Sequence, residues 1–301
     1  MLSLNLIYPF LFSFTKYSGN AASTTVSNFF PDRFAASLFS DDREKQDFSS
    51  QHLASSIEEA WESICDSYRS GCDGDGESCA ADYDAIEGII QAGTGSKDLV
   101  AGTTASAAIF SYDDASEVTV LNCGDSRTLL IGKPRANEAS APKLFGRRKP
   151  SLIHFSTRDH SPKDEIEGDR LQAGCDAGLD YSLPQCSMSR WWLKIGDYQY
   201  AVARSLEGGV ATSKGIVSDP DVTTICLNKM STEREFPSLV IASDGLFEVL
   251  DNEQVGQFVL KLRMNGESAS DVAKALCAEA VQKGSSDNIS AVLVYLDDKS
   301  M

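Results

Sequence analysis

Apolar and polar positions follow two different patterns along this chain. A spacing of three to four residues, typical of amphipathic helices, predicts helices over 22–38, 53–68, 165–173 and 252–262, and a last one that begins at Ser270 and ends at Gly284. Short apolar runs rich in β-branched residues predict strands at 105–110, 118–121, 128–131, 192–202, 239–242 and 289–296. Helices and strands therefore alternate, and strands dominate after residue 103.

Acidic side chains lie at the ends of three of these strands. Asp125 follows one strand in Asn122-Cys123-Gly124-Asp125-Ser126-Arg127, and Asp244 and Glu248 follow another in Ser243-Asp244-Gly245-Leu246-Phe247-Glu248. Asp287 precedes the last strand in Ser285-Ser286-Asp287-Asn288. A single such motif is typical of a turn. Three of them, flanked by small residues that let a ligand approach, indicate a site for a hard divalent cation.

The segments between these motifs carry a family resemblance. They are, in order, Gly102 to Ala105, Thr157-Arg158-Asp159-His160-Ser161-Pro162, Glu167 to Gly174, Ala201 to Leu206, and Val217 to Val222. Together with the acidic motifs, this series resembles the metal-dependent protein serine/threonine phosphatases of type 2C over roughly residues 17–297. The resemblance implies an α+β fold, a β-sandwich of two antiparallel sheets flanked by helix pairs in four α-β-β-α layers, here lacking the first strand or two.

The resemblance also implies an activity and a set of site residues. The activity is hydrolysis of phosphoserine and phosphothreonine on proteins, with Mg²⁺ or Mn²⁺ as cofactor and phosphoproteins as partners. Asp244 and Asp287 would bind the first metal, and Asp125 would hold a weaker third ion with Asp244 and Glu248. Glu248 stands where the family usually has Asp. Structural roles are implied for Arg204, Gly245 and Asn288.

The upstream half of the implied site departs from the family. The chain has no R-x-x-M-E-D motif, and the family's F-D-G-H-G-G turn corresponds to Tyr17-Ser18-Gly19-Asn20-Ala21-Ala22. Ser18 and Gly19 then stand at the bridging Asp-Gly position, and Asn20 stands at the His position. A hydroxyl lacks the charge of a bridging carboxylate, and Asn cannot deliver a proton at neutral pH. No catalytic residue is therefore assigned.

These departures leave three interpretations of the function open. The first is an active type 2C phosphatase. The second is a pseudophosphatase that binds phosphoproteins without turnover. The third is an active phosphatase whose N-terminal sequence comes from a wrong gene model.

The chain divides at residue 17. Residues 1–16 form an apolar N-terminal segment, which is compatible with a strand, a signal-like sequence or a gene-model artefact. Pro9 interrupts the apolar run and no basic residues precede it, and both features argue against a signal peptide. Residues 17–297 form the phosphatase-like domain, with a basic insertion loop at 133–150 that ends in Gly146-Arg147-Arg148-Lys149.

Composition narrows the partners and the compartment. The net charge of −17, from 27 basic and 44 acidic residues, argues against nucleic acid and anionic membranes as partners. The eight cysteines contain no C-x-x-C pair, so a disulfide scaffold is not expected. We expect a monomer in an intracellular compartment, cytoplasmic or nuclear, with a secretory signal in residues 1–16 as the alternative.

Overall fold

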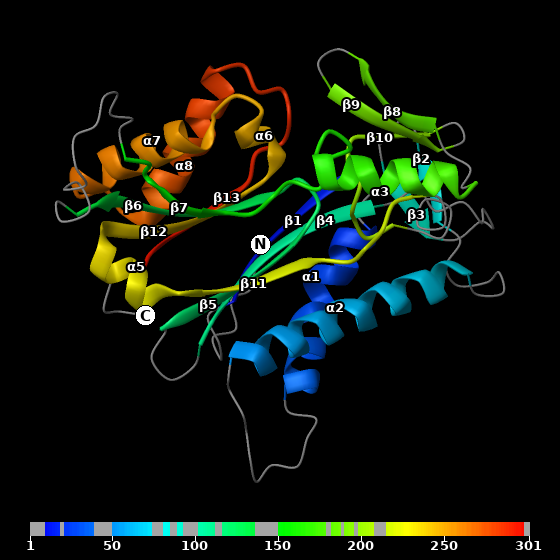
Figure 1. Cartoon of the computed structure of the whole chain (residues 1–301), viewed down its shortest axis with the longest axis horizontal. Helices are drawn as coiled ribbons and strands as arrows, with labels where there is room; N and C mark the ends of the chain where they lie inside the picture. Colours follow the sequence, from blue (N-terminus) through cyan, green and yellow to red (C-terminus); the bar gives the residue numbers. More distant parts are fainter. Residues whose placement is uncertain are drawn as a thin grey trace, which may run out of the picture.

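Two four-stranded antiparallel sheets lie face to face at the centre of the molecule (Figure 1). The structure is a computed structural model that describes residues 10–18, 21–38, 50–73, 81–84, 89–92, 102–111, 116–135, 150–178, 182–187, 190–195, 198–207 and 215–297. The first sheet has the order β1-β4-β5-β11, formed by β1 Phe10–Ser18, β4 Gly102–Phe110, β5 Glu117–Cys123 and β11 Asp221–Cys226. The second has the order β13-β12-β6-β7, formed by β13 Ala291–Tyr295, β12 Arg234–Ala242, β6 Arg127–Pro134 and β7 Ile153–Ser156.

Strand β4 shows how the sequence builds the sandwich. All of its residues are buried, because side chains alternate between two covered faces. Ile109 packs beneath helices, whereas its neighbour Phe110 packs in the core shared by the two sheets. On that shared face, the hydroxyl oxygens of Ser106 and Thr128 lie 2.8 Å apart and join the two sheets by a buried hydrogen bond.

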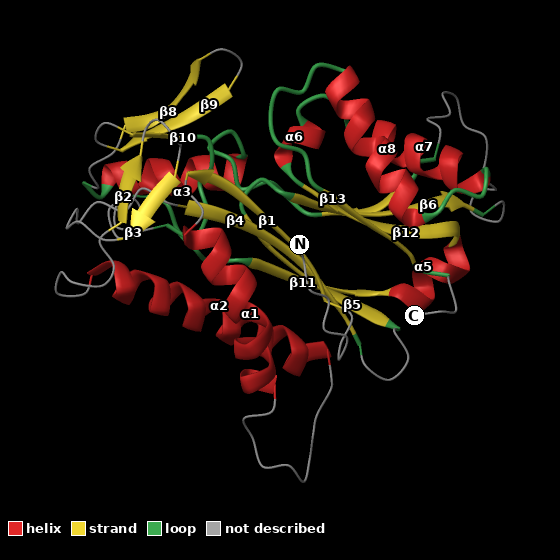
Figure 2. Cartoon of the chain, turned by 180° about the vertical axis from the view of Figure 1, so that it is seen from behind, coloured by secondary structure: helices red, strands yellow, loops and turns green. Residues whose placement is uncertain are grey.

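Helix pairs cover the two outer faces of the sandwich (Figures 1 and 2). On the first sheet lie α1 Ala21–Leu38 and α2 Ser50–Asp73, and on the second lie α7 Asn252–Met264 and α8 Ala269–Gln282. Phe30, Ile57 and Trp61 of the first pair are fully buried against β4 and β5. Val259 and Leu276 of the second pair pack on β6 and β12. The four α-β-β-α layers match the fold that the sequence predicted.

Shorter elements complete the described part of the chain. They are α3 Glu165–Asp176, α5 Leu227–Glu233 and α6 Asp244–Phe247, a sheet of β8 Ser182–Ser187, β9 Arg190–Ile195 and β10 Tyr198–Tyr200, and a hairpin of β2 Ala81–Asp84 and β3 Ile89–Ala92. None of the helices in the described ranges has the length and apolar character that crossing a membrane requires.

Part of the apolar N-terminal segment is a strand. β1 lies at the edge of the first sheet and pairs with β4 from Phe10 opposite Ile109 to Ser18 opposite Gly102. Residues 1–9 lie outside the described residues, and so do Gly19 and Asn20. The backbone of Ser18 thus stands at the C-terminal end of an antiparallel edge strand.

The predicted C-terminal end of α3 and the predicted start of α8 were wrong. Helix α3 does not stop at Gly174 but continues to Asp176, and the glycine after its C-cap is Gly178, which adopts a φ of +90°. Helix α8 begins after Ser268 rather than Ser270, because the Ser268 hydroxyl accepts a hydrogen bond from the backbone N–H of Asp271 at 3.2 Å.

The predicted insertion loop also begins too early. Lys133 and Pro134 still belong to β6, where Lys133 pairs with Glu235 of β12 at 2.9 Å. The described chain resumes at Pro150, so residues 136–149, which include the basic cluster, lie outside the described residues.

Candidate metal centre

Three acidic side chains from two neighbouring loops meet at one end of the second sheet. Asp244 is the first residue of α6, directly after β12, and Glu248 caps the same short helix one turn later. Asp287 precedes β13. One carboxylate oxygen from each of Asp244, Glu248 and Asp287 lies within 4.8 Å of the other two. This all-oxygen donor set fits a hard divalent cation such as Mg²⁺ or Mn²⁺.

Pairing of β12 with β13 brings the two loops together. Ala242 lies opposite Ala291, so the residues after one strand meet those before the other. Ser243 links the loops through its hydroxyl, which accepts from the backbone N–H of Ser290 at 3.0 Å and donates to the backbone oxygen of Asn288 at 3.2 Å. The hydroxyl of Ser285 adds a hydrogen bond to the backbone oxygen of Gly245 at 2.7 Å.

Gly245 permits this close approach because it has no side chain. A Cβ at this position would lie 2.8 Å from the backbone oxygen of Asn288 and 3.2 Å from the Cβ of Asp287. The backbone also orients both carboxylates: Gly245 N–H donates to Asp244 at 3.0 Å, and Asn288 N–H donates to Asp287 at 2.7 Å. Gly245 and Asn288 therefore lie at the contact between the two acidic motifs.

Asp125 approaches the same pocket from the turn between β5 and β6. The preceding residue, Gly124, has a φ of +121°, and a Cβ there would lie 2.3 Å from Thr104 Cγ2, so only glycine fits. Burial raises the pKa of Asp125 well above its usual range, and the negative charges of Asp244, Asp159 and Asp287 raise it further. Asp125 does not join the three-carboxylate group, but it lines the pocket beside Asp244 and Glu248.

His160 holds the turn that presents Asp125. Its Nδ1 accepts a hydrogen bond from the backbone N–H of Gly124 at 3.1 Å, and its own backbone N–H donates to the Gly124 oxygen at 2.8 Å. The opposite ring nitrogen, Nε2, lies 3.0 Å from Asp221. Since Nδ1 is an acceptor, Nε2 carries the proton of the neutral ring and faces the Asp221 carboxylate. Burial lowers the pKa of His160, which favours this neutral form.

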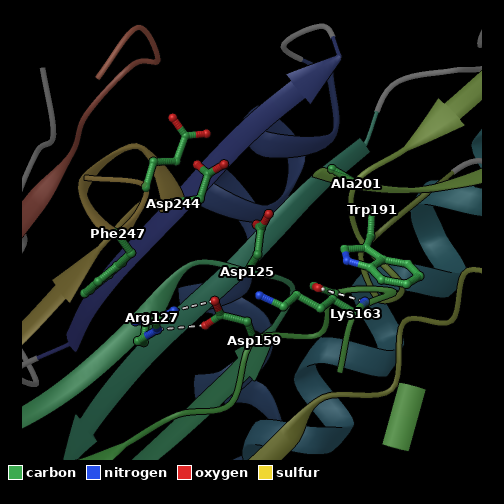
Figure 3. A pocket seen from close by; sticks show the side chains of 10 residues that line it. Asp125, Arg127, Asp159, Lys163, Trp191, Ala201, Asp244 and Phe247 are labelled. Atoms are coloured by element: carbon green, nitrogen blue, oxygen red, sulfur yellow. Dashed lines mark hydrogen bonds and ion pairs between the residues drawn. The ribbon is translucent and has the colours of Figure 1, made fainter. Parts of the chain in front are cut away.

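Asp125, Asp244 and Glu248 line a pocket of about 270 Å³. Figure 3 shows its labelled wall, and the full lining is Asp125, Arg127, Asp159, Ser161, Lys163, Trp191, Ala201, Asp244, Phe247 and Glu248. Arg127 and Asp159 form a bidentate ion pair, with N–O distances of 2.8 and 2.5 Å. The side chain of Lys163 extends into the space beside Asp125 and Asp159 (Figure 3). An opening of this size, with both acidic and basic groups on its wall, can hold a small anionic group next to the metal ligands.

Arg204 lies outside this pocket, in a buried ionic network behind it. Its guanidinium contacts Glu167 at 2.6 and 2.8 Å and Asp221 at 3.3 Å. Glu167 is fully buried and is also paired with Arg170 at 3.0 Å. Because Asp221 faces His160, the network supports the turn that carries Asp125.

The upstream motif is described only by its backbone. Ser18 ends β1 opposite Gly102, and Gly102 starts the strand against which the Gly124 turn packs. Gly19 and Asn20 lie outside the described residues. The structure therefore brings Asp125, Asp244 and Glu248 to one pocket and places Asp287 beside Asp244 and Glu248. Of Ser18 it places only the backbone, on the facing sheet.

Several pocket residues had no assigned role at the sequence level. Asp159 and Arg127 belong to motifs that carry the family resemblance. Their ion pair joins residues 32 positions apart, so no local sequence pattern predicts it. Lys163 and Trp191 come from a loop and from β9, and a lone Lys or Trp predicts nothing by itself. Only the tertiary fold shows that these side chains share a wall.

Comparisons with known proteins identify relatives among the protein phosphatases of type 2C. The family model for protein phosphatase 2C matches residues 50–289 of this chain. Probable protein phosphatase 2C 61 of Arabidopsis thaliana is 30% identical over 202 residues, which cover 66% of this chain and 56% of that protein. Protein phosphatase 1B of Mus musculus is 29% identical over 175 residues, which cover 58% of this chain and 38% of that protein. The chain thus spans less than two thirds of the length of these curated relatives.

Solved structures resemble the whole described architecture. The serine-threonine phosphatase 2C from Toxoplasma gondii superposes with a TM-score of 0.64 at 18% identity, covering 95% of this chain and 84% of that chain. A C. elegans sex determining protein also gives a TM-score of 0.64, at 17% identity, over 95% of this chain and 56% of that chain. At these identities the likeness shows the fold, and it confirms the predicted α+β sandwich.

Proposed function

Because the chain belongs to the protein phosphatase 2C family, we propose that it hydrolyses phosphoserine and phosphothreonine esters of proteins, with Mg²⁺ or Mn²⁺ held by Asp244, Glu248 and Asp287. The observation that carries the proposal is the convergence of these three carboxylates within 4.8 Å of one another, with Asp244 and Glu248 lining a pocket. The retained carboxylates and the family fold together support a phosphoric monoester hydrolase.

The chain's own residues would prepare the site for a cation and a phosphate. A divalent cation, when bound, lowers the pKa of a water ligand and neutralises phosphoryl oxygens. Backbone N–H groups hold the Asp244 and Asp287 carboxylates in fixed orientations, so their oxygens need little reorganisation on binding. Arg127 ties Asp159 to the pocket wall and stacks its guanidinium 4.2 Å from the centre of the Phe247 ring. This ion pair keeps the Asp159 charge from repelling an incoming phosphate as strongly as a lone carboxylate would.

A second candidate function is a phosphoprotein-binding module without turnover. It is favoured by the absence of an R-x-x-M-E-D motif and by serine at position 18, where the family's bridging carboxylate would stand. The cation site at Asp244, Glu248 and Asp287 uses neither feature, so binding can persist where hydrolysis is lost. In both cases the proposed partners are phosphoproteins.

Phosphate release from a phosphothreonine peptide in millimolar Mn²⁺ tests the proposal. We expect turnover by the native chain and a loss of at least about a hundredfold in the Asp244→Asn/Asp287→Asn double variant. The matched control is Asp32→Asn/Asp169→Asn, which removes two exposed carboxylates outside the pocket and should leave the rate unchanged.

Calorimetric titration of Mn²⁺ separates the two candidates. Heat of Mn²⁺ binding that disappears in the Asp244→Asn/Asp287→Asn variant, together with no phosphate release, would support the binding module. Phosphate release that is equal in both double variants would show that Asp244 and Asp287 do not carry the reaction.

A further inference from the structure

The pocket wall contains two basic side chains, and one of them is fully occupied by the protein. Arg127 directs Nε and Nη2 to Asp159, at 2.8 and 2.5 Å, and directs Nη1 to Asn252 at 2.6 Å. Its guanidinium plane also packs on Phe247. Turning Arg127 toward a ligand would break a bidentate ion pair, so its charge is neutralised by Asp159 and does not bind an incoming group.

Lys163 is different. It follows Pro162 in the loop between β7 and α3, where its backbone N–H donates to the Ser161 hydroxyl at 3.1 Å. Its side chain is exposed, lines the pocket, and points into the space beside Asp125 and Asp159 (Figure 3). Among the described residues the Lys163 ammonium forms no ion pair within 4.0 Å. In the described part of the chain, a positive charge without an ion-pair partner therefore lines the same pocket as Asp244 and Glu248.

The charge balance of the site calls for such a group. Asp244, Glu248 and Asp287 carry a total charge of −3 when ionised, so a divalent cation would leave −1 on this donor set. A phosphomonoester carries about −1.5 to −2 at neutral pH. Asp125 and Asp159 also line the pocket, and Asp159 is paired with Arg127. Without a further cation, a phosphate would enter a site whose net charge repels it.

We propose that Lys163 is the substrate-binding residue that contacts the phosphate group of the phosphoprotein in this chain. The proposal rests on the proposed function, since it takes the phosphomonoester of that reaction as its ligand. An ammonium suits this role, because it offers three donors on a flexible stem and can follow the phosphate as the group moves. The hydrogen bond from the Lys163 backbone N–H to the Ser161 hydroxyl orders the local turn that carries the side chain.

Two variants of Lys163 test the contact. Lys163→Gln keeps a polar side chain but removes the charge, and Lys163→Arg keeps the charge. The matched control is Lys261→Gln on α7, an exposed lysine without an ion pair in the described structure and outside the pocket. The readout is fluorescence anisotropy of a labelled phosphopeptide, in which a non-hydrolysable phosphonate replaces the phosphothreonine ester, and of its unphosphorylated twin, in saturating Mn²⁺.

The expected result is specific to phosphate. Lys163→Gln should weaken binding of the phosphopeptide about tenfold, as expected for loss of a hydrogen bond to a charged group. Binding of the unphosphorylated twin should not change. Lys163→Arg should restore affinity to within about threefold of the native chain, and Lys261→Gln should bind as the native chain does.

Two outcomes would overturn the proposal. The first is equal phosphopeptide affinity in Lys163→Gln and the native chain at saturating Mn²⁺, with a change only in Mn²⁺ affinity, which would mean that Lys163 merely balances the carboxylates. The second is no preference of the native chain for the phosphopeptide over its twin. Turnover assays on the same proteins distinguish the two proposals. If binding depends on Lys163 but no phosphate is released, only the proposed hydrolysis is refuted. If phosphate is released and the KM of Lys163→Gln equals that of the native chain, only the role of Lys163 is refuted.

Discussion

Replacing Glu167 with Gln should destabilise the fold strongly, because this carboxylate is the buried centre of the ionic network behind the pocket. Its side chain is fully buried. One oxygen accepts a hydrogen bond from Arg204 Nε at 2.8 Å and lies 2.6 Å from Arg204 Nη2, and the other accepts from Arg170 Nε at 3.0 Å. Gln has the same shape, but it removes the charge and turns an NH₂ group toward a guanidinium. The change therefore removes the carboxylate that Arg170 contacts and leaves Arg204 with only the more distant Asp221 carboxylate, at 3.3 Å.

The magnitude follows from that geometry. Breaking a buried pair by removing one partner costs about 3–5 kcal/mol. Arg204 is nearly buried, with a side-chain exposure of 13%, whereas Arg170 is 30% exposed and can recover some hydration. We therefore expect the free energy of unfolding to fall by about 3 kcal/mol, the lower end of that range.

The pH dependence gives an independent check on the cause. Burial alone would raise the pKa of Glu167, but the hydrogen bond and charge of Arg204, together with Arg170, outweigh burial and hold the pKa below its usual value. A carboxylate with a lowered pKa in the folded state stabilises the fold above its unfolded pKa, near about 4.3, and loses that contribution as pH falls through the folded pKa. The difference between the native chain and Glu167→Gln should thus be full at pH 7 and shrink below about pH 4.

Urea unfolding followed by tryptophan fluorescence measures this difference. The control is Glu165→Gln, an exposed carboxylate in the first turn of the same helix. A loss below about 1 kcal/mol in Glu167→Gln at pH 7, or a loss that stays constant down to pH 3, would refute the role of the network.

Two further changes probe the metal centre and a second buried acid. Gly245→Ala should weaken Mn²⁺ affinity about tenfold by calorimetry, because the new Cβ would lie 2.8 Å from the Asn288 backbone oxygen and push the two acidic motifs apart. In the control Gly168→Ala, the new Cβ meets nothing closer than 3.9 Å. Equal Mn²⁺ affinities in the two variants would contradict this prediction. Glu207→Gln should raise stability at pH 7 in thermal melts, because burial raises the pKa of Glu207 well above its usual range. A raised pKa in the folded state lowers the stability of the native chain by about 1.4 kcal/mol for each pH unit above the unfolded pKa, so the gain in stability should vanish near pH 4. No gain at pH 7 would contradict the raised pKa of Glu207.

Much of the fold and of the acidic site could be predicted because their signals are local. Asp125, Asp244 and Asp287 each stand next to a strand of short apolar residues and beside glycine, serine or asparagine. A strand end and a turn are both readable from a few consecutive residues. The four-layer order, by contrast, came from the family resemblance, since the pairing of β1 with β4 joins segments about ninety residues apart.

Features set by competing neighbours could not be predicted in the same way. Ser268 and Ser270 are both good N-cap residues, and only the backbone path decides that Ser268 caps α8. Gly174 resembles a helix end, but α3 continues for two more residues because the positive φ falls at Gly178. Contacts such as His160 with Gly124, which span 36 residues, have no counterpart in local sequence at all.

The structure separates cation binding from the part of the site that departs from the family. Asp244, Glu248 and Asp287 are held by β12, β13 and α6, and the hydrogen bonds of Ser243 and Ser285 close that unit within the second sheet. Ser18 belongs instead to β1, the edge strand of the first sheet. A change at the end of β1 can alter what faces the carboxylates, yet it leaves their mutual geometry intact. Natural variation at position 18 should therefore affect the rate of hydrolysis far more than the affinity for the first cation.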